Sequence, residues 1–132
     1  MSIAQLQFEK LQRVHEDATL TNLSDGSGWV VVPNFPLPLG WSHQATTVRF
    51  HIPPAYPSAK PDCFWTDAGL TLGTGSEPQA TRIQLGPGNT GQIPGNTGQL
   101  RWFSWHVSMW SPNRDSLLTY LAAIKRRLSE IK

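Results

Sequence analysis

The chain has 132 residues, of which 39% are hydrophobic and 15% are charged, and its formal net charge at pH 7 is +2. This length and apolar content suit one sizeable core, so we expect residues 1–132 to form a single domain. The low charge density, with no basic residues interleaved among aromatic ones, argues against nucleic acid as a partner. The single cysteine, Cys63, excludes an intramolecular disulfide.

The start of the chain and its hydropathy predict no membrane partner. Residues 1–17 carry charges within their first helical turns and lack the apolar centre of a signal peptide. No stretch of the sequence approaches the roughly 20 apolar residues that span a bilayer. We therefore expect a cytoplasmic protein.

The first half of the chain predicts one helix followed by strands. Residues 3–15 place apolar side chains at near-helical spacing among polar ones, which predicts an amphipathic helix. After turn residues at 24–28, the β-rich run 29–32 predicts a strand. A proline-rich turn at 33–40 leads to residues 45–52, where apolar and polar residues alternate, and this period of two predicts a strand with one buried face.

The middle of the chain predicts an extended link, a third strand and a long irregular region. Residues 53–61 contain four prolines and therefore cannot form a regular strand, whereas residues 62–66 return to strand character. Three strands joined by short links favour an antiparallel meander. Residues 67–100 are rich in glycine and include the tandem repeat PGNTGQI at 87–93 and PGNTGQL at 94–100. The repeat lacks the Gly-Lys-Ser/Thr ending of a phosphate-binding loop, so we predict an irregular loop.

The C-terminal residues carry a strong helical pattern. Five apolar residues recur at spacings of four, three, four and three: Leu117, Leu121, Ile124, Leu128 and Ile131. They predict a helix whose apolar stripe packs against the sheet. Ser111 followed by Pro112 is expected to cap this helix, with Asn113 or Asp115 as caps of a later start. The predicted fold class is therefore α+β.

Residues 101–112, RWFSWHVSMWSP, hold three of the six tryptophans and one of the four histidines of the chain. If residues 101–107 are extended, the side chains of Ser104 and His106 project from the same face. A serine hydroxyl needs a base to act as a nucleophile, and histidine, with an ordinary pKa of about 6.5, can supply one. Alternatively, both are strand residues whose polar atoms bond to the backbone. The tryptophans are expected to be mainly core residues.

Three short motifs occur in an order that resembles the ubiquitin-conjugating-enzyme fold. Tyr56-Pro57, followed by Pro61 and Phe64, is similar to the tyrosine-proline segment and following strand of that fold. Trp110-Ser111-Pro112 is similar to the tripeptide that precedes its second helix, and residues 102–106 resemble a tryptophan-serine-x-histidine stretch of its bacterial branch. The resemblance implies an N-terminal helix, an antiparallel β-meander, an irregular active-site loop and a C-terminal helix.

The same resemblance implies a bacterial conjugating enzyme. Such an enzyme accepts a ubiquitin-like protein from an activating enzyme as an acyl intermediate and transfers it to an amine of a target protein, and antiphage defence is the setting that the resemblance implies. In familiar members the acyl group is carried by a cysteine eight positions before the tryptophan of the tripeptide, where this chain has Trp102. The family's histidine-proline-asparagine motif is replaced by residues 66–69, TDAG. We therefore expect an oxyester on Ser104, with His106 activating the hydroxyl or orienting the amine.

Alternatives remain for the residues of this site. Cys63 is a displaced candidate nucleophile, although a cysteine flanked by aromatic residues on a strand is usually a buried core residue. Ser108 and Ser111 are rival hydroxyls. Asn89 and Asn96 are candidate donors to the oxyanion that acyl transfer generates. No metal or other cofactor is expected, because the histidines show no metal-ligand spacing.

The alternative function is non-catalytic. The missing cysteine and the missing histidine-proline-asparagine motif are what an inactive conjugating-enzyme variant would show, and such a variant would bind a ubiquitin-like protein or an activating enzyme without carrying an acyl group. An aromatic-rich carbohydrate or peptide binder would explain the tryptophans but not the order of the motifs.

Overall fold

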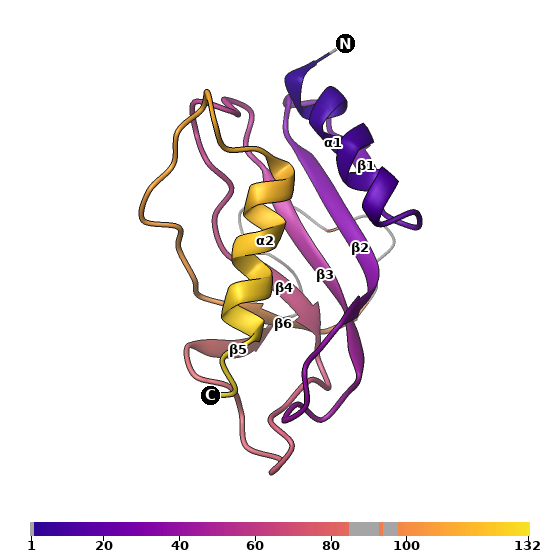
Figure 1. The fold of residues 1–132 in the computed structure, drawn as a ribbon, viewed down its shortest axis with the longest axis vertical. Helices are drawn as coiled ribbons and strands as arrows, with labels where there is room; N and C mark the ends of the chain where they lie inside the picture. Colours follow the sequence, from indigo (N-terminus) through magenta and orange to yellow (C-terminus); the bar gives the residue numbers. More distant parts are fainter. Residues whose placement is uncertain (1, 85–92, 94–97) are drawn as a thin grey trace.

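Two helices cover one face of a six-stranded sheet (Figure 1). This computed structural model describes residues 2–84, 93 and 98–132. The strand order is β1-β2-β3-β4-β6-β5, and all neighbouring strands are antiparallel. The elements are α1 (Ile3–Val14), β1 (Thr19–Asn22), β2 (Gly28–Pro36), β3 (Ala45–Ile52), β4 (Phe64–Asp67), β5 (Thr81–Gln84), β6 (Leu100–Phe103) and α2 (Leu117–Leu128).

The predicted α+β class is confirmed, and so is the antiparallel meander, which runs from β1 to β4. The first helix and strand β3 lie where the apolar periodicity predicts them. Strands β1 and β5 were not predicted. Both are four-residue strands at the two edges of the sheet, and none of their side chains is fully buried. An edge strand of this kind carries no regular apolar alternation, so its sequence gives little signal.

The main core lies between the sheet and the two helices. Alternate residues of the central strands point to this side, and α2 buries its apolar stripe against them. Helix α1 buries Phe8 and Leu11 there, whereas its other large apolar residues, Ile3, Leu6 and Val14, are exposed. The fully buried members include Leu11 of α1, Val48 and Phe50 of β3, and Leu117 and Ile124 of α2. Four of the five residues in the predicted C-terminal stripe are buried, whereas Ile131 lies beyond the end of α2 and is 40% exposed.

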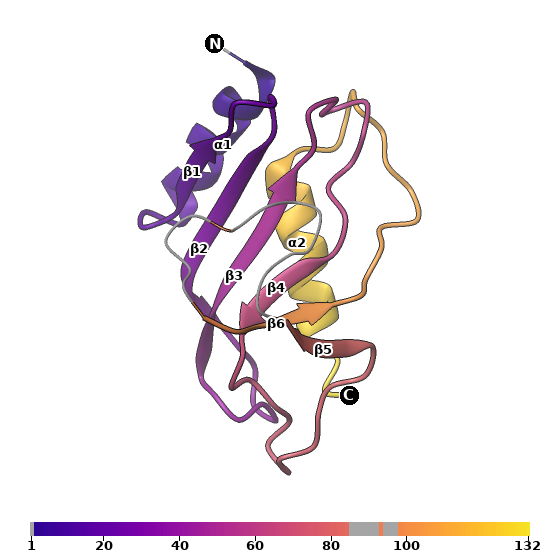
Figure 2. The same cartoon turned by 180° about the vertical axis from the view of Figure 1, so that it is seen from behind.

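A smaller apolar cluster lies on the opposite face of the sheet. This face is turned toward the viewer in Figure 2. Trp29 of β2 and Trp65 of β4 meet there with ring centroids 5.2 Å apart, and Leu100 of β6 packs beside them. The sheet therefore buries large side chains on both faces.

The predicted helix cap is wrong. Helix α2 begins after Ser116, whose hydroxyl accepts a hydrogen bond from the Thr119 N–H and completes a capping box. Ser111, Asn113 and Asp115 precede this cap. The Ser111 carbonyl accepts the N–H of Asp115, at 2.7 Å, so this segment forms a separate turn before the helix starts.

The turn that leads into α2 runs beside the proline-rich link after β3 (Figures 1 and 2). The indole N–H of Trp110 donates to the Pro57 carbonyl, at 2.8 Å, and the Lys60 ammonium donates to the Val107 carbonyl. These two hydrogen bonds connect the link after β3 to the segment that precedes α2. Among the described residues, none of the helices is long and apolar enough to cross a membrane.

Candidate functional site

The site forms where the pairing between β4 and β6 loses its register. Phe64 faces Phe103, so a regular ladder would place Cys63 opposite Ser104. Instead, the Cys63 N–H donates to the Trp105 carbonyl, at 3.0 Å. Ser104 is thus the extra residue, as in a β-bulge, and its own N–H donates to Ala80 next to β5.

This break changes the geometry that the sequence predicts. Strand β6 ends at Phe103, so the condition under which Ser104 and His106 would share a face, a strand through residue 107, is not met. His106 Nδ1 lies 2.5 Å from Oδ1 of Asp62. The Ser104 hydroxyl makes no hydrogen bond with a described residue. The structure therefore brings His106 together with Asp62 and not with Ser104, and a catalytic role of Ser104 and His106 stays a prediction.

The backbone of Cys63 is held in an unusual conformation beside Asp62. Its φ is +60°, in the left-handed region, which costs a non-glycine residue free energy on the order of 1 kcal/mol. Its carbonyl accepts a hydrogen bond from the buried Tyr120 hydroxyl, at 2.7 Å, and its N–H is bound by Trp105. Because both backbone groups are bound, the chain next to Asp62 is fixed.

The Cys63 thiol is a poor candidate for the nucleophile. The residue is 6% exposed, as expected for a core cysteine. Burial is the largest cause of a raised pKa for the thiol, and the nearby Asp62 carboxylate raises that pKa further, while hydrogen bonds from the Trp105 backbone and the Trp102 side chain act in the opposite direction. A raised pKa leaves less of the reactive thiolate at neutral pH.

Asp62, Cys63 and His106 are the one trio of potential metal ligands in the described part of the chain, with ligand atoms within 4.8 Å of one another. In a tetrahedral zinc site with bonds of about 2.0 to 2.3 Å, neighbouring ligand atoms lie about 3.5 Å apart. The 2.5 Å separation between Asp62 and His106 is too short for two ligands of one ion. The arrangement fits a hydrogen-bonded pair with a thiol beside it and does not fit a coordination sphere.

Two hollows flank Asp62 and share the side chains of Asp62 and Lys60. The larger, of about 650 Å³, is lined by Ser58, Ala59, Lys60, Asp62, His106, Trp110 and Pro112. The smaller, of about 280 Å³, is lined by His51, Pro53, Lys60, Asp62, Cys63, Trp65, Gln84 and Trp102. The side chains of His106 and Asp62 are 59% and 57% exposed, so a macromolecular substrate can reach them.

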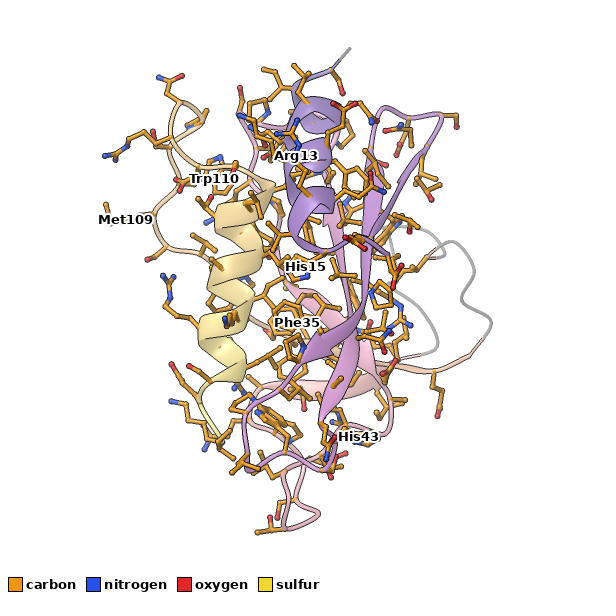
Figure 3. The ribbon with its side chains drawn as sticks, turned by 45° about the vertical axis from the view of Figure 1, so that its right-hand side comes forward. Arg13, His15, Phe35, His43, Met109 and Trp110 are labelled. Atoms are coloured by element: carbon orange, nitrogen blue, oxygen red, sulfur yellow. The ribbon has the colours of Figure 1, made fainter. Side chains whose placement is uncertain are left out.

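The tryptophans around the site have mainly structural contacts. Trp102 packs in the smaller cluster, with the Arg82 guanidinium 4.8 Å from its ring centroid. Trp105 and Trp110 pack against the main core. Figure 3 shows Trp110 near the start of α2, beside Met109, which extends into solvent.

The remaining candidates lie apart from the pair or outside the described structure. Ser108 is exposed, and the Ser111 backbone N–H is bound by the Asp115 carboxylate. Asn89 and Asn96 lie outside the described residues, as does most of the tandem repeat. Among the other histidines, Figure 3 shows His15 beside Phe35 and His43 at the end of the molecule away from Trp110.

Asp62 is the functional candidate that the sequence pattern did not reveal. It is 44 residues away from His106 in the sequence, and no motif links the two. The one signal available was its place two residues before β4, since pairing that strand with residues 100–103 would have placed Asp62 near the end of the RWFSWH stretch.

One of three comparisons with known proteins found a match. The profile described as prokaryotic E2 family E matches residues 10–131, a span that holds the whole sheet, the Asp62–His106 pair and α2. Comparison with curated proteins and with solved structures found no match. The match covers nearly the whole chain and confirms the resemblance to conjugating enzymes, which are the proteins termed E2. The chain therefore belongs to prokaryotic E2 family E.

Proposed function

We propose that this protein is a conjugating-type acyltransferase that accepts a ubiquitin-like protein from an activating enzyme and transfers it to an amine of a target protein. Its family gives it a conjugating-enzyme-like function. The observation that supports catalysis is the exposed His106–Asp62 pair, which lies at the register break and borders a groove of about 650 Å³. An extended acyl-carrying tail and an acceptor amine can both reach such a site.

The proposed acyl acceptor is Ser104. In the first step its hydroxyl oxygen attacks the activated carbonyl carbon, its proton passes to Nε2 of His106, and the bond to the activating enzyme breaks, with that proton passing to the leaving group. In the second step the amine nitrogen attacks the ester carbonyl carbon and loses a proton to Nε2 of His106, the amide bond forms, and the Ser104 oxygen leaves and takes up that proton. Among the described residues, the Ser104 hydroxyl and His106 Nε2 make no hydrogen bond, so the proton transfer requires these two side chains to approach each other when the substrate binds.

Two further features bear on this choice. The competing Cys63 thiol is buried and its pKa is raised, which disfavours a thioester there. An acyl transfer also needs hydrogen-bond donors to the developing oxyanion, and Asn89 and Asn96 remain the proposed donors.

The test is a search for the covalent intermediate. The protein is incubated with a cognate ubiquitin-like protein, its activating enzyme and ATP, and adducts are separated with and without thiol reductant. We expect an adduct that resists reductant and is cleaved by hydroxylamine. It should be lost in Ser104→Ala and kept in Cys63→Ala and in Ser108→Ala, which serves as the matched control for a neighbouring hydroxyl.

Other outcomes would redirect the assignment. A reductant-sensitive adduct that is lost in Cys63→Ala would place the acyl group on the thiol. No adduct with any form of the protein, together with preserved binding of the activating enzyme, would support the non-catalytic alternative. That alternative is favoured by one specific observation, namely that Trp102 stands at the position of the usual cysteine.

A further inference from the structure

The pairing of Asp62 with His106 points to a role for the carboxylate that goes beyond the proposed catalytic residues. We propose that Asp62 is a positioning residue, which holds His106 as the Nδ1–H tautomer and thereby presents Nε2 as the base. This inference rests on the proposed function, because it deepens the role of His106 in acyl transfer. It is carried by three observations: the short contact, the backbone ties around it and the exposure of both side chains.

The first observation fixes the location of the proton. An ionised carboxylate only accepts hydrogen bonds, so the nitrogen that faces Asp62 at 2.5 Å must carry the hydrogen. A neutral imidazole carries one N–H, which leaves a lone pair on Nε2. Nε2 of His106 is therefore the atom that can take the proton of an attacking hydroxyl or amine.

The second observation is that two hydrogen bonds, one between backbone groups and one from a side chain to the backbone, lie on either side of the pair. Asp62 lies between Lys60 and Cys63, and His106 lies between Trp105 and Val107. The Cys63 N–H donates to the Trp105 carbonyl, at 3.0 Å, and the Lys60 ammonium donates to the Val107 carbonyl. The two segments are thus joined directly before and after His106, which holds the carboxylate opposite the imidazole.

The third observation, the exposure of both side chains, indicates that the pair orients the imidazole and adds little to the stability of the fold. The side chains of His106 and Asp62 are both more than half exposed. An exposed pair of this kind usually contributes less than about 1 kcal/mol to the free energy of unfolding. Its stability contribution therefore does not account for the close contact, whereas control of the imidazole tautomer and orientation does.

The cation that lines both hollows has a partner other than the Asp62 carboxylate. This cation is Lys60, whose ammonium donates to the Val107 carbonyl. The Cys63 sulfur lies within 4.8 Å of the carboxylate of Asp62 and of the imidazole of His106. The variant Asp62→Asn changes the acceptor that faces His106 without removing its bulk.

The test uses the full chain with ¹⁵N-labelled histidine, and it records the imidazole tautomer of His106 by NMR at a pH where the ring is neutral. We expect the Nδ1–H tautomer in the wild type. In Asp62→Asn the side-chain amide can donate to Nδ1, so the population should shift to the Nε2–H tautomer. Asp17→Asn is the matched control, because it removes the same charge from an exposed residue in the turn between α1 and β1, outside the linings of both hollows.

Activity provides the second readout. The kcat of acyl transfer should fall about tenfold or more in Asp62→Asn, with KM and the free energy of unfolding unchanged, while Asp17→Asn behaves as the wild type.

Three results would each overturn the proposal. They are an Nε2–H tautomer of His106 in the wild type, an unchanged tautomer in Asp62→Asn, and acyl transfer by Asp62→Asn at the wild-type rate. Stoichiometric zinc in the wild type that is lost in Asp62→Asn would also overturn it, because Asp62 would then be a ligand. Failure of the wild type to form any adduct would overturn the proposed function, and the NMR result is independent of that failure.

Discussion

Cys63 is the residue whose chemistry the fold changes most clearly, and its thiol provides a direct test of the contact with Asp62. Burial and the Asp62 charge raise the pKa of the thiol above 9.0, its ordinary value. The thiolate is the reactive form, so alkylation of the wild type should be slow at neutral pH. Removing the charge in Asp62→Asn lowers the thiol pKa, and alkylation should be faster than in the wild type at the same pH.

The measurement is the alkylation rate as a function of pH, followed by mass spectrometry. Cys63 is the single cysteine, so every alkylated molecule reports on this thiol. Asp17→Asn should match the wild type. An equal or slower rate in Asp62→Asn would show that the carboxylate does not raise the thiol pKa.

Single residues also show where sequence reasoning succeeds and where it stops. His106 could be proposed from the sequence because it stands in a short stretch with Ser104 and the tryptophans. Its partner Asp62 could not, because the contact depends on β4 pairing with β6 and on a one-residue change of register. The prediction that Ser104 and His106 project from one face assumes an unbroken strand, and the bulge at Ser104 breaks this strand.

At the scale of elements, the start of α2 allows the sequence-based cap to be tested against the structural one. Ser116 caps the helix through the Thr119 N–H, so Ser116→Ala should lower the free energy of unfolding by about 1 kcal/mol. Ser111→Ala should cost much less, because the Ser111 hydroxyl makes no hydrogen bond in the described structure. Urea unfolding of both variants measures the difference. A larger decrease in the free energy of unfolding in Ser111→Ala than in Ser116→Ala would support Ser111 as the helix cap.

The elements differ in how well their sequences predict them, for physical reasons. Helix α2 was predictable because it buries a continuous stripe, and β3 because every second residue is buried. The cap was missed because Ser111 followed by proline has the composition of a helix start, yet the residues up to Asp115 close a separate turn. Strands β1 and β5 were missed because edge strands take their stability from one neighbour and bury little of their own surface.

At the scale of the whole molecule, the order of motifs predicted more than the composition did. Composition indicated one sizeable core, whereas the order of Tyr56-Pro57 and Trp110-Ser111-Pro112 along the chain pointed to conjugating enzymes. The structure shows why these two motifs belong together: the Tyr56 and Trp110 rings are 5.9 Å apart, and the Trp110 indole donates to Pro57. They tie the proline-rich link to the turn before α2, and the proposed site lies beside this tie.

The buried titratable groups predict that stability is greatest in a window between about pH 7 and 8.5. Burial, as the largest cause, lowers the pKa of His15 and His51 from 6.5. Below that pH the unfolded chain binds more protons than the folded one, so the free energy of unfolding should fall as the pH decreases through 6.5. Burial raises the pKa of Cys63 from 9.0 and that of Tyr120 from 10.0. The unfolded chain releases these protons first, so stability should also fall as the pH rises above 9.0. Urea unfolding at a series of pH values measures the free energy of unfolding on both sides of this window. In His51→Gln that free energy should fall less steeply below pH 6.5, because only His15 then contributes, and its decrease above pH 9.0 should be unchanged. A free energy of unfolding that rises as the pH falls below 6.5 would contradict a lowered pKa for these imidazoles.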